Sequence, residues 1–372
     1  MDMSKRSLCI SMINRRNVVT GGSALALAFA LPCKSAEAEP VQELFAATRK
    51  SPQGAFSTAI FRRDGSDVNA VSLPGRGHDV TACPVTRTVV AFARRPGNFA
   101  VAFSIDQKRQ PIRFICPSDR HFYGHGVFSR YGRLLYATEN DFETGTGCIG
   151  IYDATRDYKR IGEFNAFGVG PHDIALMPDG ETLVIAVGGI ETHPDIGHGR
   201  TKLNIATMSP ALVYINTKSG DLLEKHELPR KQHKLSLRHL AVGTSRTVIV
   251  GGQLQRGAPA RMPLVLRHQL GKQPELIELP NQLTASLRGY ISSVAVNRTG
   301  DTVAITGARG GVAAFFDIAS GRVQGTVRQN DVSGVTPAGD HFLLTSGDGA
   351  VVENNQNQPT QWVWDNHAEK VG

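Results

Sequence analysis

The chain has 372 residues, of which 41% are hydrophobic and 20% charged, and it contains 39 glycines and 19 prolines. This composition excludes a disordered, collagen-like or coiled-coil chain and is typical of a globular protein. The formal net charge is +8, but no stretch combines dense basic and aromatic residues, so we expect no nucleic-acid partner.

The first 38 residues have the pattern of an export signal. Basic residues precede a short apolar stretch at 24–31, and a small-x-small cleavage site ends at Ala38. The pair Arg15 and Arg16 favours twin-arginine (Tat) export, and an ordinary secretory signal is the alternative. Because about 20 apolar residues are needed to span a bilayer, we expect cleavage, a periplasmic location and no membrane span in residues 39–372.

A repeat of about 47 residues organises the rest of the chain. In the clearest copy, residues 170–187 form two apolar runs around a Pro-Asp-Gly turn, which predicts a β-hairpin. Strands at 211–216 and 222–228 complete this unit. Further copies begin near His78, His125, His239, Ile291 and Asp331.

Four antiparallel strands repeated radially are typical of a β-propeller. Seven blades of this length fit residues 39–372, and six blades with longer loops are the alternative. No helical periodicity competes. A partial unit at 54–74 and a final strand near 362–364 predict that the two chain ends share one blade, which removes free sheet edges. We therefore predict an all-β fold, a single seven-bladed β-propeller domain of four-stranded antiparallel blades.

Four histidines recur where the innermost strands begin. His78, His125 and His172 are spaced by 47 residues, and His239 follows after one repeat plus an insertion. Innermost strands begin at the mouth of the central channel, so these imidazoles converge there and form a candidate metal or anion site. Counted from the following turn, two of them are one position out of register with the other two, which leaves two opposed sets open. A structural plug is the remaining alternative.

The insertion, at 188–210, lies on the side of the channel mouth. Long loops on rigid scaffolds commonly carry function, so we expect this one to close over a ligand, with a solvated lid as the alternative. The predicted ligand-binding residues are His193, His198, Arg200, Lys202 and Asn204 of this loop, and Glu139 of a neighbouring loop.

The other loops of this face carry charges of both signs, so the sequence predicts a mixed rim rather than one strong field. Local clusters there can bind a carboxylate or a phosphate. The basic members are Arg94, Arg95, Arg256, Arg261 and Arg309, and the acidic members include Asp141, Glu143, Glu191, Asp195 and Asp348.

Motifs of common enzymes are absent from the sequence. It has no Gly-x-Ser-x-Gly elbow, no Walker loop, no Gly-x-Gly-x-x-Gly dinucleotide fingerprint between a strand and a helix, and no His-Glu-x-x-His. No Cys-x-x-Cys is present, which excludes a thiol redox motif and haem c attachment. Cys83, Cys116 and Cys148 remain after cleavage, and this odd number allows at most one disulfide.

Several phrases resemble an uncharacterised family of Tat-exported bacterial propellers, the domain of unknown function 1513, within the YVTN and WD40-like group. They lie at 123–129, 136–141, 170–173, 188–194 and 237–242. The resemblance implies an exported propeller, often encoded beside imelysin-like proteins thought to act in iron acquisition. An imelysin-like protein is therefore an expected partner.

Three functions follow as hypotheses. The first is a propeller that binds iron, another transition metal or a metal complex at His78, His125, His172 and His239, for uptake or handling rather than catalysis. The second is a metal- or cofactor-dependent enzyme, an oxidoreductase or lactonase-like hydrolase, with Glu139 and Asp173 as its carboxylates. The third is a protein-binding scaffold whose channel its own side chains fill.

Overall fold

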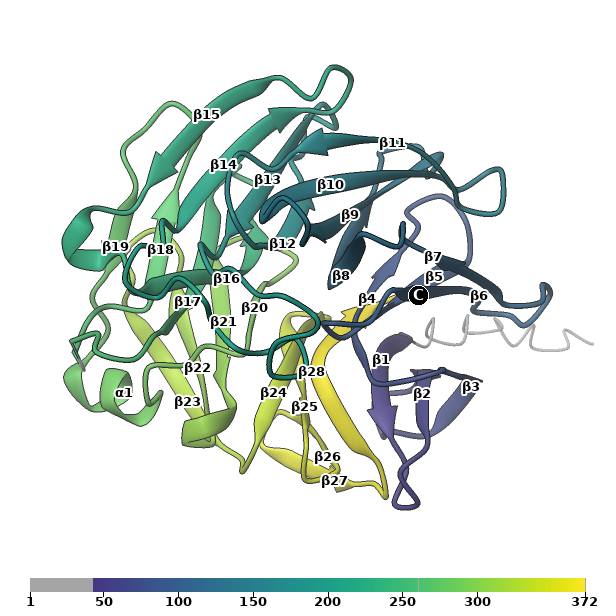
Figure 1. Cartoon of the computed structure of the whole chain (residues 1–372). Helices are drawn as coiled ribbons and strands as arrows, with labels where there is room; N and C mark the ends of the chain where they lie inside the picture. The colour runs from purple at the N-terminus through teal and green to yellow at the C-terminus, as the bar shows by residue number, and fades with distance from the viewer. Residues whose placement is uncertain (1–42, 260, 372) are drawn as a thin grey trace, which may run out of the picture. The chain divides into compact units, whose positions relative to one another are not determined.

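The computed structural model describes residues 43–259 and 261–371, so the predicted export signal lies outside the described residues. The described chain forms seven separate four-stranded sheets, all of them antiparallel. Their innermost strands contact one another in a ring, and the sheets radiate from it as the blades of a propeller (Figure 1). The prediction of a seven-bladed β-propeller is confirmed.

The blade that closes the ring contains both ends of the described chain. Its innermost strand is β28 (Val363–Lys370), followed outward by β1 (Phe45–Lys50), β2 (Phe56–Phe61) and β3 (Asp67–Ser72). In this blade Trp364 is 2% exposed, and its ring lies 4.6 Å from that of Phe61. The blade shared between the two ends is thus confirmed, and an apolar contact across it stabilises the closure.

The other six blades follow one another along the sequence, each running from the channel outward. The first three contain β4 (Gly77–Ala82), β5 (Thr88–Ala93), β6 (Phe99–Ser104) and β7 (Ile112–Ile115); β8 (Arg120–Phe128), β9 (Leu134–Asp141), β10 (Thr146–Asp153) and β11 (Lys159–Asn165); and β12 (Pro171–Leu176), β13 (Thr182–Val187), β14 (Ala211–Asn216) and β15 (Leu222–Glu227). The last three contain β16 (Leu235–Val242), β17 (Val248–Leu254), β18 (Val265–His268) and β19 (Glu275–Ile277); β20 (Ser293–Val296), β21 (Thr302–Gly307), β22 (Val312–Asp317) and β23 (Val323–Arg328); and β24 (Val332–Ala338), β25 (His341–Ser346), β26 (Ala350–Glu353) and β27 (Gln356–Pro359).

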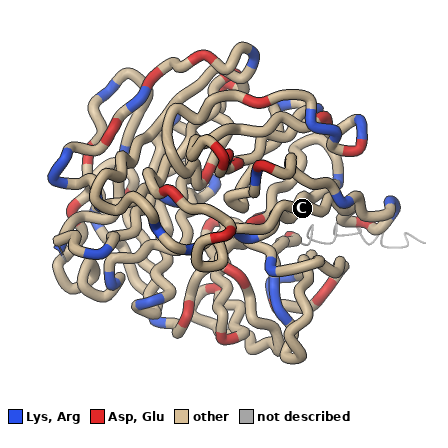
Figure 2. Tube along the Cα trace, viewed as in Figure 1, with Lys and Arg blue, Asp and Glu red and all other residues tan. Residues whose placement is uncertain are grey.

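The core lies between neighbouring blades. The second strands are almost wholly buried, as in β13, and their apolar side chains pack on the faces of adjoining sheets. The outermost strands alternate between half-buried and exposed residues, as β11 does, because only one of their faces is covered. Charged side chains are correspondingly spread over loops and outer strands (Figure 2).

Among residues 43–259 and 261–371, helical structure is confined to short connections. The six-residue helix α1 (Asn281–Ser286) joins β19 to β20, and two 3₁₀ turns lie at Arg230–Gln232 and Ala308–Gly310. The sequence analysis missed α1 because six residues are too few to show a helical period. Within the described residues, no helix is long and apolar enough to cross a bilayer.

The predicted insertion, residues 188–210, connects β13 to β14. Hydrogen bonds within it give the loop a defined course: Asn204 donates from Nδ2 to the Gly189 carbonyl over 2.9 Å, and its Oδ1 accepts from the Glu191 backbone over 2.8 Å. The loop crosses the middle of the molecule in Figure 1, over the ring of innermost strands.

Candidate functional site

Five histidines meet in the central channel, and we call them the histidine cluster: His78, His125, His172, His239 and His367. They come from β4, β8, β12, β16 and β28. In every pair except His172 and His367, the ring centroids are 4.5 to 6.4 Å apart. All four histidines that the sequence analysis selected therefore converge, and the structure adds His367.

The register offset between the predicted pairs is absorbed by β-bulges in the innermost strands. Pairing with the next strand shifts between Gly77 and Val80, and again between Phe122 and Gly126. The same interruption occurs beside His172 and beside His239. A bulge redirects side chains by adding a residue to one strand. The four imidazoles therefore lie in one cluster, and the two sets that the offset left open are found within it: His78 and His172 accept from arginines, whereas His125 faces carboxylates.

His125 is held as a metal ligand is held in proteins. Its Nδ1 lies 2.9 Å from Oδ2 of Asp79 and 3.4 Å from Oδ1 of Asp173. A carboxylate only accepts hydrogen bonds, so Nδ1 carries the proton and Nε2 keeps its lone pair. That Nε2 is buried and has no partner. A carboxylate behind the imidazole is the usual second partner of a metal-bound histidine.

Two further imidazole nitrogens complete a set of three. Nδ1 of His239 and Nε2 of His367 are buried without a hydrogen-bond partner, and Nδ1 of His367 lies 3.1 Å from the Ser293 hydroxyl. One ligand nitrogen each of His125, His239 and His367 falls within 4.8 Å of the others. Ligand nitrogens on a tetrahedral ion lie about 3.4 Å apart, so small side-chain rotations suffice for binding. We call these residues the three-histidine set.

His78 and His172 have a different hydrogen-bonding pattern. Nη1 of Arg94 lies 3.3 Å from Nδ1 of His78, and Nη1 of Arg238 lies 3.0 Å from Nδ1 of His172. Arginine only donates, so both Nδ1 atoms accept. A neutral ring that accepts at Nδ1 carries its proton on Nε2, and this state favours donation to a ligand over metal coordination. One ligand nitrogen each of His78, His125 and His172 also lies within 4.8 Å of the others, so the prediction of His78 and His172 as metal ligands stays a prediction.

Burial keeps the cluster uncharged at neutral pH. Desolvation lowers the pKa of every member, that of His367 to about 3, and positive neighbours such as Arg238 beside His172 lower it further. Desolvation raises the pKa of Asp79 and Asp173 to about 6. Neutral imidazoles next to carboxylates that are ionised above pH 6 are the protonation states that metal binding requires.

The cluster separates two cavities of opposite charge. One, of about 310 Å³, is lined by all members of the three-histidine set together with Asp79, Asp173 and Glu369; we call it the acidic cavity. The other, of about 280 Å³, is the cationic cavity, which His78, His172 and His239 line with six basic side chains: Arg94, Arg95, Arg200, Lys202, Arg238 and Arg309. His239 borders both.

Two of the six predicted ligand-binding residues line the cationic cavity, Arg200 and Lys202. Asn204 instead organises the loop by its two backbone contacts. His193 packs edge-on against Phe142, and His198 is exposed.

The placement of Glu139 in a loop at the channel face was wrong. It lies within β9 and is fully buried, and it accepts hydrogen bonds from Tyr152 and from Arg160, the latter over 2.9 Å. The second strand of a blade is covered on both faces, which explains this burial. Asp173, the other carboxylate of the enzyme hypothesis, does face His125.

Sequence reasoning missed His367, Asp79 and Arg238. Asp79 and Arg238 each adjoin a selected histidine, and the bulges turn them toward the channel. His367 has no repeat phrase around it, because its strand completes a blade that the N-terminal segment begins. The histidine spacing could have indicated Asp79 and Arg238, because both immediate neighbours of a residue at a bulge are candidates to face the channel.

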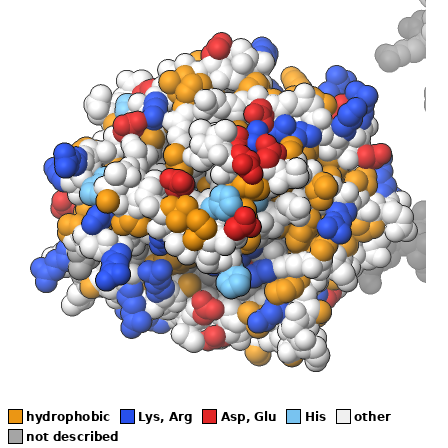
Figure 3. Space-filling view, viewed as in Figure 1, with side chains coloured by type: hydrophobic (Ala, Val, Ile, Leu, Met, Phe, Trp, Pro, Cys, Tyr) orange, Lys and Arg blue, Asp and Glu red, His pale blue; other side chains and the backbone are white. Residues whose placement is uncertain are grey.

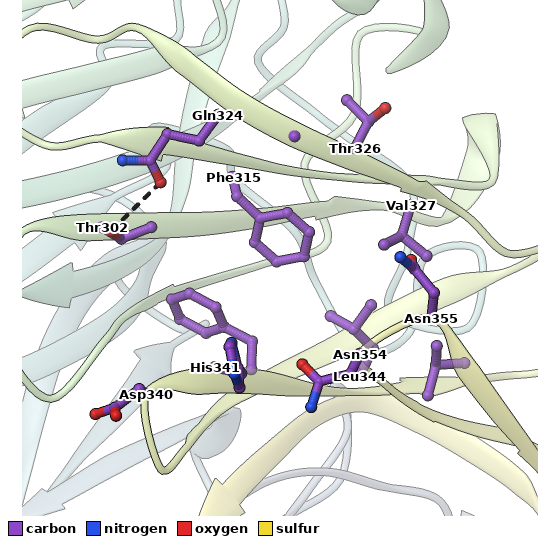
Figure 4. Close-up of a pocket in the computed structure, with 13 residues that line it drawn as sticks. Thr302, Phe315, Gln324, Thr326, Val327, Asp340, His341, Leu344, Asn354 and Asn355 are labelled. Atoms are coloured by element: carbon purple, nitrogen blue, oxygen red, sulfur yellow. Dashed lines mark hydrogen bonds between the residues drawn. The ribbon is translucent and has the colours of Figure 1, made fainter.

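Another cavity, of about 320 Å³, lies away from the channel, between the blades of β20–β23 and β24–β27 (Figure 4). Apolar side chains such as Phe315 and Leu344 line it, and Thr302 bonds to Gln324 across its edge over 3.4 Å. It has no cluster of ligating groups like that of the channel.

The face in Figure 3 shows histidine, acidic and basic side chains gathered near its centre.

Residues 71–371 match the model of a protein family described as "Protein of unknown function (DUF1513)". The chain belongs to this family. A search of curated proteins found no relative of this DUF1513 chain. Among solved structures, a chain of Kuenenia stuttgartiensis hydrazine synthase is similar, with a TM-score of 0.58 and 14% identity over 80% of this chain and 91% of that one. At that identity the similarity shows the propeller fold alone.

The three cysteines of the DUF1513 propeller, Cys83, Cys116 and Cys148, are buried and free. Desolvation and the nearby charge of Glu139 raise the pKa of the Cys116 thiol to about 12, and they raise that of Cys148 as well. Burial thus keeps the thiols of Cys116 and Cys148 protonated at neutral pH, and a protonated thiol is a weak nucleophile.

Proposed function

We propose that this propeller binds a transition-metal ion at the three-histidine set, with Asp79 and Asp173 orienting His125. The observation that carries the proposal is that His125, His239 and His367, each of which has a buried imidazole nitrogen without a partner, also bring one ligand nitrogen each within 4.8 Å of the others. An unpaired buried polar atom is costly, and a bound ion would satisfy all three at once.

The scaffold hypothesis is less well supported. It requires a filled channel in which the imidazoles bond to backbone carbonyls. The partners found for His78, His125, His172 and His367 are side chains, and a cavity lies on each side of the cluster.

The physiological role that we propose is the handling of a metal ion or metal complex, with iron as the first candidate. Imidazole also suits zinc, copper and nickel, so iron rests on the family resemblance, as does an imelysin-like partner. The periplasmic location rests on the sequence pattern of residues 1–38.

A metal-dependent enzyme is the second candidate. Three protein ligands leave a coordination position open, as in catalytic zinc sites, and the cationic cavity next to His239 offers room for a substrate. Turnover of a bound substrate by the metal-loaded protein would separate this candidate from simple metal handling.

The test is elemental analysis of mature protein purified without an affinity tag or chelator. We expect one equivalent of metal in the wild type and in His172→Ala, and loss of the metal in His239→Ala. The two variants remove the same side chain from neighbouring blades, and circular dichroism would confirm that both fold. Metal-free wild type after reconstitution with iron, zinc and copper would contradict the proposal.

A further inference from the structure

The cationic cavity has a large excess of positive charge. Within the part of the chain that the structure describes, no aspartate or glutamate lines it. Asp365 is the nearest counter-charge: it is 7% exposed and lies 3.1 Å from Arg94, and it is shared with Arg76, 2.6 Å away. The six basic side chains of the cavity therefore have one neighbouring carboxylate, which Arg76 also contacts.

These cations are brought together from distant parts of the sequence. Arg94 and Arg95 follow the end of β5, Arg238 lies on β16, and Arg309 follows β21. The remaining two, Arg200 and Lys202, come from the loop 188–210. Four blades therefore contribute to one cavity.

Buried donors in the cavity have no acceptor. Arg238 is 5% exposed, and its Nε is buried without a hydrogen-bond partner, as is Nη1 of Arg95. Buried charges in proteins are normally paired. The amine of Lys202 donates to the Gln255 side-chain carbonyl, which is a neutral partner.

Burial and mutual repulsion both disfavour the charged forms of these groups, and a bound anion would offset that repulsion. Desolvation, together with Arg238, Arg309 and Arg95, lowers the pKa of Lys202 to about 8. A bound anion would reverse these effects by favouring the charged forms.

Two of the three histidines that line this cavity, His78 and His172, have the tautomer that donates from Nε2. Arg94 and Arg238 hold Nδ1 of His78 and His172 as acceptors, which leaves the ring proton on Nε2 of each. The cavity wall thus presents guanidinium, ammonium and imidazole N–H groups, and guanidinium forks match carboxylate and phosphate oxygens in pairs.

We infer that the cationic cavity is a binding site for a small multivalent oxyanion, a polycarboxylate or a phosphate, next to the histidine cluster. The site stands on residues other than the proposed metal ligands, apart from His239 at its border. It goes beyond the proposed function and does not depend on a bound metal.

The test uses metal-free full-length mature protein, stripped with phenanthroline, which is a neutral chelator and does not compete as an anion. Isothermal titration in chloride buffer would measure oxalate, citrate and inorganic phosphate separately. We expect at least one of them to bind at about 1 mM or tighter. Tighter binding of the carboxylates identifies a polycarboxylate site, and tighter binding of phosphate identifies a phosphoryl site.

Variants locate the binding. Arg95→Met and Arg238→Met each remove a donor without an acceptor, and each should weaken binding about 10-fold or more. Arg95→Met serves if Arg238→Met fails to fold. Arg256→Met is the matched control, an exposed arginine outside the cavity. Absence of binding up to about 10 mM, or equal affinities in all variants, would overturn the inference and leave the metal proposal intact.

Discussion

Replacing Asp79 by asparagine tests how the channel prepares His125. The carboxylate accepts the Nδ1 proton over 2.9 Å, and Asp173 lies 3.4 Å from the same nitrogen. An asparagine amide accepts less strongly, and when its NH₂ group is turned toward Nδ1 it favours the tautomer that protonates Nε2. Both changes weaken His125 as a ligand.

The size of the effect follows from the two distances. Loss of a carboxylate behind a metal-bound histidine typically costs 10- to 100-fold in affinity, which is about 1.4 to 2.7 kcal/mol. Because Asp173 remains in reach, Asp79→Asn should lie near the lower end. The double variant with Asp173→Asn should lie near the upper end.

Competition with a chromogenic chelator would measure the metal affinity of each variant. Asp195→Asn, an exposed aspartate of the long loop, is the control and should bind as the wild type does. If the double variant folds and binds metal with unchanged affinity, the carboxylates do not orient a ligand and the reasoning about Nδ1 is refuted.

Three further predictions address other parts of the molecule. Glu139→Ala should lower the free energy of unfolding in urea by about 1–3 kcal/mol, because the buried Tyr152 hydroxyl loses its acceptor and Arg160 keeps only Glu163 as a carboxylate partner; metal content should stay unchanged, and a loss of metal would restore Glu139 to the site. Trp364→Ala should cost about 3–5 kcal/mol in the same assay, since its ring packs on Phe61 where the chain ends meet; a cost below about 1 kcal/mol would argue against an apolar closure. Oxalate affinity should be constant below pH 8 and fall as the pH rises above 8, because Lys202, with its pKa lowered to about 8, loses its proton; in Lys202→Met this fall should disappear from the titrations, and a fall that persists would assign it to another group.

The architecture could be predicted because propeller blades repeat a local signal. A Gly-containing turn between two apolar runs predicts a hairpin wherever it occurs, and the spacing of His78, His125 and His172 predicts that equivalent positions meet at the axis. Both inferences need only the period of the sequence. The convergence of these residues with His239 is accordingly where sequence and structure agree.

The other features of the candidate site cannot be predicted from the length of the sequence repeat. Bulges decide which of two neighbouring residues faces the channel, so Asp79 and Arg238 were missed although both adjoin selected histidines. The charges of the predicted mixed rim are segregated in space, with Arg94 and Arg200 on one cavity while Glu139 is buried inside a blade. Strand order alone could not show that separation.

The most direct measurement of the central claim is an anomalous difference map from crystals of the metal-loaded protein, collected at the absorption edge of the bound metal. We predict one peak about 2.1 Å from Nε2 of His125, Nδ1 of His239 and Nε2 of His367, with His78 and His172 outside bonding distance. A peak bonded to His78 or His172, or a metal bound elsewhere while the three-histidine set stays empty, would contradict the account.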